Sequence, residues 1–63
     1  MKKSYRVMAI LDAERLSDGK AVHLLPGQIL KDAEERAVTM EFETDEGRCA
    51  CRLSTFFAKT SPA

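Results

Sequence analysis

The chain has 63 residues, ten basic and ten acidic side chains, and a formal net charge of zero. Apolar residues at 44% and charged residues at 32% exclude wholesale disorder. A single domain of about 60 residues buries only about 60% of its unfolded surface, so a lone monomer is marginally stable. Association is a common remedy at this size, and we expect a homodimer.

Neither a membrane span nor a secretory leader is expected. The longest uncharged apolar stretch, residues 7–11, is far shorter than the roughly 20 residues that cross a bilayer. Lys2 and Lys3 precede only this short run, and no small-residue cleavage site follows it. Cys49 and Cys51 lie two positions apart, which is poor geometry for a mutual disulfide. A reducing, cytoplasmic setting is therefore the expectation.

The charges are unevenly distributed along the chain. Residues 1–31 carry six basic and three acidic side chains, residues 32–47 one basic and seven acidic, and residues 48–63 three basic ones only. Mixed charges usually form solvated faces. The sharper alternative is an acidic surface that binds a partner protein with a basic surface. Its candidate residues are Asp32, Glu34, Glu35, Glu41, Glu43, Asp45 and Glu46.

The first part of the chain predicts a strand over residues 5–11, after a frayed start at residues 1–4. The strand is apolar on both faces except at Arg6, which suits a central or strongly bent strand. Residues 12–16 either continue it or form a helical turn. An Asp-Gly pair then marks a turn, because both residues tolerate positive φ.

A second strand is predicted at residues 20–25, with Val22 and Leu24 on one face and the odd-numbered residues on the other. A Pro-Gly pair at residues 26–27 indicates a type II turn, in which proline presets φ and glycine takes the positive φ. Asp32 and Glu35 then resemble a helix N-cap and its capping-box partner, which predicts one or two helical turns.

The strongest local pattern is an antiparallel hairpin over residues 37–53, with its turn at residues 44–47. Apolar and polar residues alternate on both sides of the turn. The register places Phe42 opposite Cys49, Met40 opposite Cys51, Val38 opposite Leu53, Glu43 opposite Arg48, and Arg52 beside Thr39. Each cross-strand pair contributes roughly 0.2–1 kcal/mol. A slip by one residue would turn the apolar set to water.

After the hairpin, the pattern of residues 54–57 predicts a 3₁₀ turn or a last short strand, in which Phe56 or Phe57 closes the core. Residues 59–63 are expected to fray. The whole pattern is typical of a mainly β fold: a small, strongly bent antiparallel sheet or SH3-like barrel of four or five short strands, with one short helical turn. The alternative is an α+β swapped-hairpin dimer in which residues 29–36 form a true helix.

No residue pattern predicts an enzyme, a metal centre or a cofactor site. Cys49, Cys51 and His23 are the only soft metal ligands, one fewer than a structural zinc site uses. Both cysteines lie in phase with apolar residues, which favours core packing. His23 has no nucleophile placed beside it and is best explained as a half-buried structural histidine. The carboxylates lack apolar neighbours that would raise a pKa for acid–base work, and no glycine-rich phosphate loop is present.

A nucleic-acid interface is the main alternative function. Its candidate residues are Arg6, Lys20, Arg48 and Arg52. Arg48 and Arg52 share one hairpin face, and Arg6 would join them if the first strand lies alongside. A neutral chain with an acidic middle binds polyanions poorly unless its basic residues cluster.

Residues 19–30, followed by an acidic turn and a strand–turn–strand pattern, resemble the AbrB/MazE-type swapped-hairpin antitoxins. Those proteins run from a basic strand through a proline into a short helix and a hairpin. The resemblance implies a dimer that binds DNA. Two features depart from the family's pattern: the extra strand within residues 1–16, and Glu35-Arg36 in place of the usual Gly-Asp before the hairpin.

The sequence therefore favours a small non-enzymatic binding module that acts through protein–protein contact, a regulator or inhibitor of bacterial, phage or plasmid type. The alternative is a dimeric DNA- or RNA-binding transcriptional regulator. A zinc- or redox-sensitive module built on Cys49 and Cys51 is a third hypothesis.

Overall fold

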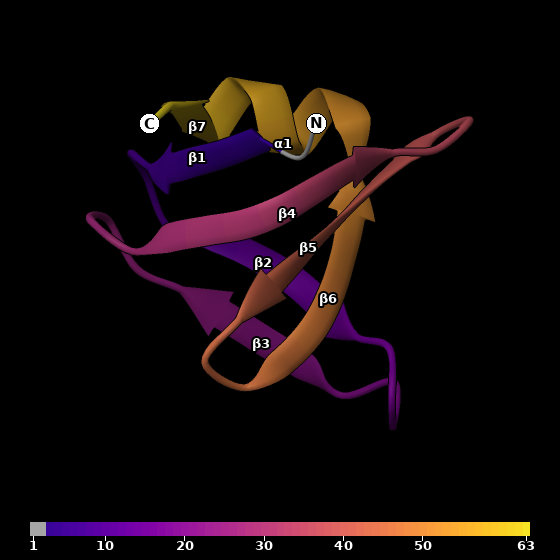
Figure 1. The fold of residues 1–63 in the computed structure, drawn as a ribbon. Coiled ribbons are helices and arrows are strands. Elements are labelled where there is room, and N and C mark those ends of the chain that lie inside the picture. Colours follow the sequence, from indigo (N-terminus) through magenta and orange to yellow (C-terminus); the bar gives the residue numbers. More distant parts are fainter. Residues whose placement is uncertain (1–2) are drawn as a thin grey trace.

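Antiparallel strands form a single sheet that curls strongly on itself, and one short helix lies at one end of it (Figure 1). The structure is a computed structural model and describes residues 3–63. Within that range the elements in chain order are β1 (Lys3–Val7), β2 (Leu11–Arg15), β3 (Ala21–Leu24), β4 (Ile29–Glu35), β5 (Thr39–Thr44), β6 (Gly47–Arg52), α1 (Leu53–Lys59) and β7 (Thr60–Pro62). The predicted mainly β, strongly bent sheet is confirmed.

The order of pairing explains the curl. The strands follow one another as β3-β2-β6-β5-β4-β1-β7. Strands β1 and β2 are consecutive in the chain, yet β1 pairs with β4 and β2 pairs with β6. One chain segment therefore flanks both sides of the β4–β5–β6 meander and draws the sheet into a half-barrel. The sheet has seven strands rather than four or five, because the first apolar run divides in two, residues 29–35 form a strand, and the C-terminal tail adds another.

The division of the first strand occurs at residues 8–10. Val7 and Leu11 on either side of this bend are buried, whereas Met8 and Ile10 are exposed. The Val7 N–H donates to the carbonyl of Gln28 at 2.9 Å, and the Met8 N–H donates to the carbonyl of Lys59 at 2.8 Å. The apolar run is thus two strands joined by a bend, and only its buried residues, Val7 and Leu11, face the core.

The β2–β3 hairpin and the turn after it follow the predicted pattern. Val22 and Leu24 are buried, and the alternate residues of β3 are exposed. After β3, Gly27 has a φ of 96°, and the Gln28 N–H donates to the carbonyl of Leu25 at 3.1 Å. These are the features of the predicted type II turn.

The β5–β6 hairpin has the predicted register. Phe42 pairs with Cys49, Met40 with Cys51, Glu43 with Arg48, and Thr39 with Arg52. Val38 also lies opposite Leu53, but its expected place on the apolar face is wrong, because Val38 is 71% exposed. The ladder begins at Thr39, while Leu53 already starts α1, so only the Leu53 N–H still bonds the Val38 carbonyl.

The predicted helix at residues 32–35 is wrong, and so is the helical alternative for residues 29–36. These residues belong to β4, which pairs with β1 on one side and β5 on the other. Leu30 is fully buried, and a bulge falls between Lys31 and Glu34. Asp32 lies at this bulge with a φ of 52°, a conformation that aspartate tolerates better than most residues. Tertiary pairing on both sides therefore overrides the local capping signal.

The 3₁₀ turn or short strand predicted at residues 54–57 is wrong, because Leu53–Lys59 form the α-helix α1. The prediction that Phe56 or Phe57 closes the core is confirmed for Phe56. Phe56 is fully buried; its ring lies 4.8 Å from that of Tyr5 and 5.4 Å from that of Phe42. Phe57 is half-exposed. The tail does not fray, because residues 60–62 form β7 and pair with β1. Residues 3–4 of the expected frayed start are also in β1, and residues 1–2 lie outside the described residues.

Candidate functional site

Three of the predicted acidic residues meet on the outer face of β4 and β5, around one arginine. Arg48 Nη2 lies 2.9 Å from Glu34 Oε1, Nε lies 3.7 Å from Glu41 Oε1, and Nη1 lies 3.6 Å from Glu43 Oε1. Arg36 adds contacts of 3.6 Å to Glu34 and 3.3 Å to Glu41. Most of this charge is therefore compensated within the chain, at roughly 0.2–1 kcal/mol for each partly exposed pair.

The carboxylates of the other four predicted acidic residues form no ion pair with Arg48. Asp45 and Glu46 form the tip of the β5–β6 hairpin, where Glu46 Oε1 lies 3.6 Å from Arg15 Nη1. Asp32 is at the β4 bulge, where its main-chain carbonyl accepts a hydrogen bond from Arg48 Nη2 at 3.1 Å, and Glu35 pairs with Met40 at the far end of β4. The seven acidic residues therefore do not form one surface.

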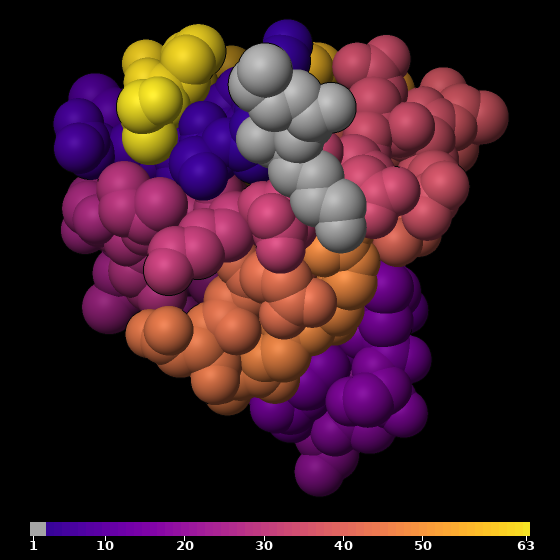
Figure 2. Space-filling view, in the orientation of Figure 1, coloured from indigo at the N-terminus to yellow at the C-terminus, as the bar shows by residue number. Residues whose placement is uncertain are grey.

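Arg15 links this tip to the β2–β3 turn. Its Nε donates to Asp18 Oδ1 at 3.1 Å. The hydrogen bond from Arg15 holds the pKa of the Asp18 carboxyl below its ordinary value. Figure 2 shows the β2–β3 turn projecting from the body of the sheet, at the end away from α1.

The basic candidates are also dispersed. Arg6 is on β1, and β4 and β5 separate that strand from β6, so the expectation that Arg6 joins Arg48 and Arg52 is wrong. Lys20 follows the β2–β3 turn. Arg48 is engaged by the glutamates described above, whereas Arg52 is exposed and forms no ion pair with residues 3–63.

The two cysteines pack as the sequence predicted. Cys49 is fully buried in the core, and Cys51 is half-buried against it. Burial raises the pKa of the Cys51 thiol to about 11, and the neighbouring Cys49 adds to the rise. The residues that the structure describes contain no group of three or more His, Cys, Asp or Glu side chains that could hold a metal ion.

Cys51 is expected to react slowly with iodoacetamide at pH 7.5. A pKa of about 11 instead of 9.0 leaves about a hundredfold less thiolate, which is the reactive form. In the folded state the Cys51 thiol keeps its proton to higher pH than in the unfolded state. The free energy of unfolding should therefore fall as pH rises from about 9 to 11. Mass spectrometry of alkylated peptides and urea titrations at each pH would measure both. Alkylation of Cys51 as fast as a free cysteine in the native protein would contradict this prediction.

His23 is exposed on β3 rather than half-buried. Its Nδ1 lies 2.5 Å from Oδ1 of Asp12, the residue directly opposite on β2. The alternation in β3 placed His23 on the face opposite Val22 and Leu24. That face turns to solvent, because no strand or helix covers it among the described residues.

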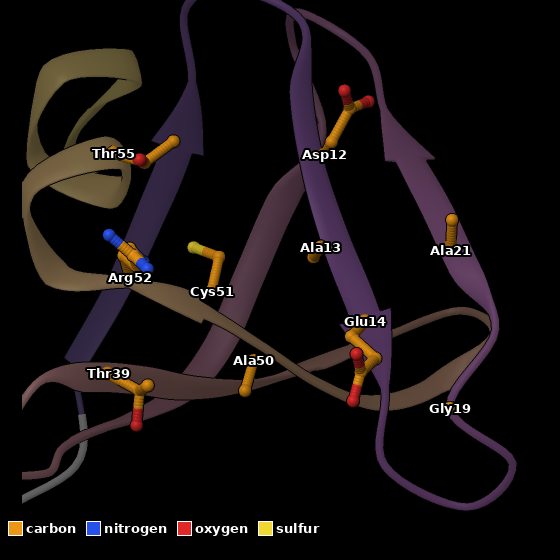
Figure 3. A pocket seen from close by; sticks show the side chains of 10 residues that line it. All are labelled: Asp12, Ala13, Glu14, Gly19, Ala21, Thr39, Ala50, Cys51, Arg52 and Thr55. Atoms are coloured by element: carbon orange, nitrogen blue, oxygen red, sulfur yellow. The ribbon is translucent and has the colours of Figure 1, made fainter.

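A groove opens beside this pair, where β2 and β6 diverge (Figure 3). The ladder between the two strands contains Glu14 opposite Ala50 and Arg15 opposite Cys49, and it ends before Asp12. The resulting hollow has a volume of about 470 Å³. Its lining comprises Asp12, Ala13, Glu14, Gly19, Ala21, Thr39, Ala50, Cys51, Arg52 and Thr55.

Four exposed apolar side chains flank the bend after β1 and the turn after β3. Leu11 pairs with Leu24, so the next residues outward, Ile10 and Leu25, lie opposite each other. Both are 55% exposed, and Met8 and Ile29 are also exposed. The Gly27 N–H donates to the Val7 carbonyl at 2.8 Å, which holds the bend and the type II turn together. We call Met8, Ile10, Leu25 and Ile29 the apolar corner.

No family model, curated protein or solved structure matches this chain. The helix of residues 53–59, the only one in the described part of the chain, is too short to cross a membrane. Sequence reasoning missed both the groove and the apolar corner. The only local signal of either was the presence of apolar residues at positions 8, 10 and 25.

Proposed function

We propose that this chain is a small non-enzymatic module that binds another protein. The apolar corner carries the proposal. Contiguous exposed apolar side chains are typical of protein–protein contact sites on soluble domains. Four large ones lie at the meeting point of two tight chain reversals, although the chain has few large apolar residues to spare for its surface.

Charge suggests what kind of protein would bind. Asp12 and Glu14 lie on the outer face of β2, next to the apolar corner, and Glu14 forms no ion pair with residues 3–63. Carboxylates beside an apolar contact favour a partner with basic residues, because complementary charges steer association and exclude wrong partners. A second copy of the chain is the other occupant to test, since a domain of this size gains stability by dimerising.

A pull-down from bacterial lysate with the full chain as bait tests the proposal. We expect one dominant protein to be retained after nuclease treatment. The double variant Ile10→Ser and Leu25→Ser should weaken its retention at least tenfold, because each buried apolar anchor contributes about 1–3 kcal/mol to binding. Val38→Ser, which changes an exposed apolar residue elsewhere, should leave retention unchanged.

The mass of the bait on size exclusion distinguishes the two occupants. A dimer that the double variant converts to monomer would assign the apolar corner to self-association. Retention that the double variant does not change would overturn the role of the apolar corner.

A dimeric DNA- or RNA-binding regulator is the second candidate, and exposed Arg52 is the observation that favours it. Phosphate contacts would make its affinity fall steeply with added salt. Captures that vanish after nuclease treatment would support this function in place of the first.

A further inference from the structure

We propose that the outer face of the β2–β3 hairpin, together with the groove beside it, binds an extended peptide segment of the partner. The segment places an apolar side chain on the apolar corner and a basic side chain, four positions along, against Glu14. This inference rests on the proposed function, because the segment belongs to the protein that the module binds.

The first observation is the order of side chains along the outer face. Two cross-strand rows on this face are Asp12 with His23 and Glu14 with Ala21. Ile10 and Leu25 lie one position beyond the Leu11–Leu24 pair, and extending the register by one residue makes them the next row, at the apolar corner. Rows in a β-strand are two residues, or about 6.7 Å, apart. The apolar row and the Glu14 row are therefore separated by about 13 Å, the span of four residues in an extended peptide.

The second observation is the small floor of the groove. Ala50 pairs with Glu14 on one side and with Glu41 on the other, so a methyl group lies between two glutamates on the outer face. Ala21 and Gly19 add further small residues to the lining. A long side chain lying over Ala50 would bring its end to the carboxylate of Glu14 without meeting a bulky neighbour.

The third observation is the end of the β2–β6 ladder. The Leu16 N–H donates to the Arg48 carbonyl at 2.9 Å, and Glu14 pairs with Ala50 two residues earlier. Alternate residues of a strand direct their main-chain groups to the same neighbour. Asp12 therefore directs its main-chain N–H and C=O toward the groove, beyond the last pair, where a peptide main chain is the natural partner.

The fourth observation is the distribution of charge across the groove. Asp12 and Glu14 lie on the β2 side, and Arg52 lies on the β6 side (Figure 3). A basic side chain is favoured on the β2 side and repelled on the β6 side, where a carboxylate is favoured. The charge on each wall thus sets the sign of the side chain that the wall accepts.

Binding of synthetic peptides to the full ¹⁵N-labelled chain tests this inference. The probe is the acetylated, amidated peptide Gly-Ile-Thr-Ser-Thr-Lys-Thr-Gly, with isoleucine and lysine four positions apart. We expect millimolar peptide to shift the amide resonances of Asp12, Glu14 and Ala50. Two control peptides should bind at least tenfold more weakly: one with glutamate in place of lysine, and one with lysine two positions from isoleucine.

Two protein variants complete the experiment. Glu14→Gln should weaken binding of the lysine peptide about two- to fivefold, as expected for the loss of one exposed ion pair, and Asp45→Asn at the β5–β6 tip should leave it unchanged. No shifts at millimolar peptide, or equal binding of the lysine and glutamate peptides, would overturn the peptide site. The proposed function fails on a different result: the absence of any nuclease-resistant protein partner in the pull-down.

Discussion

Replacing Phe56 by alanine is expected to leave much of the protein unfolded at 37 °C. Phe56 is fully buried, and its ring contacts those of Tyr5 and Phe42 from the only helix described. Removing a buried phenylalanine side chain costs about 3–5 kcal/mol. A domain of this length has a total free energy of unfolding of roughly 3–9 kcal/mol. Urea titration followed by far-ultraviolet circular dichroism would measure the loss, since the chain has no tryptophan.

Phe57 provides the matched control for this prediction. It is the same residue type in the same helix, but half of its surface is exposed. Phe57→Ala should reduce the free energy of unfolding by less than about 1.5 kcal/mol, because folding removes less of the Phe57 side chain's apolar surface from water. Equal losses for the two variants would mean that α1 does not pack through Phe56.

Replacing Leu30 by alanine is the second large expected effect. Leu30 is fully buried on β4, and its loss should reduce the free energy of unfolding by about 2–5 kcal/mol. Ile29→Ala, one residue earlier and partly exposed, should cost about 1 kcal/mol. Urea midpoints for both variants provide the comparison.

This pair also tests the strand that replaced the expected helix. Neighbouring residues in a strand point to opposite faces, so a large difference between positions 29 and 30 is the signature of β4. Similar losses of the free energy of unfolding in Leu30→Ala and Ile29→Ala would contradict the observed fold. A circular dichroism spectrum with substantial helix beyond the seven residues of α1 would contradict it as well.

These results bear on function because β4 and α1 hold the bent first strand in place. Tyr5 on β1 pairs with Leu30 and contacts Phe56, so the core fixes the strand from which the bend at residues 8–10 departs. The bend in turn exposes Met8 and Ile10 at the apolar corner. The stability variants and the binding variants are therefore distinct tests: Ile10, Leu25 and Glu14 are exposed and can be changed without opening the core.

The positions of the acidic residues show how far sequence reasoning reached in the candidate site. Glu43 opposite Arg48 was predicted, because both belong to one hairpin with a short turn. Glu34 comes from another strand, and the bulge at Asp32 sets which face its side chain occupies. No local pattern reports such a bulge, so the sequence did not show that Arg48 compensates three of the seven acidic residues.

The sequence alone determined the elements whose causes are local. Alternation and turn residues specified the β5–β6 register, the type II turn at residues 25–28 and the buried face of β3, because a one-residue change would expose apolar side chains to water. Only the tertiary structure decided the rest: β4 instead of a helix, β7 instead of a frayed tail, and the groove between Glu14 and Ala50. Each depends on residues more than twenty positions apart meeting across the sheet, and neither propensity nor periodicity in a short window contains that information.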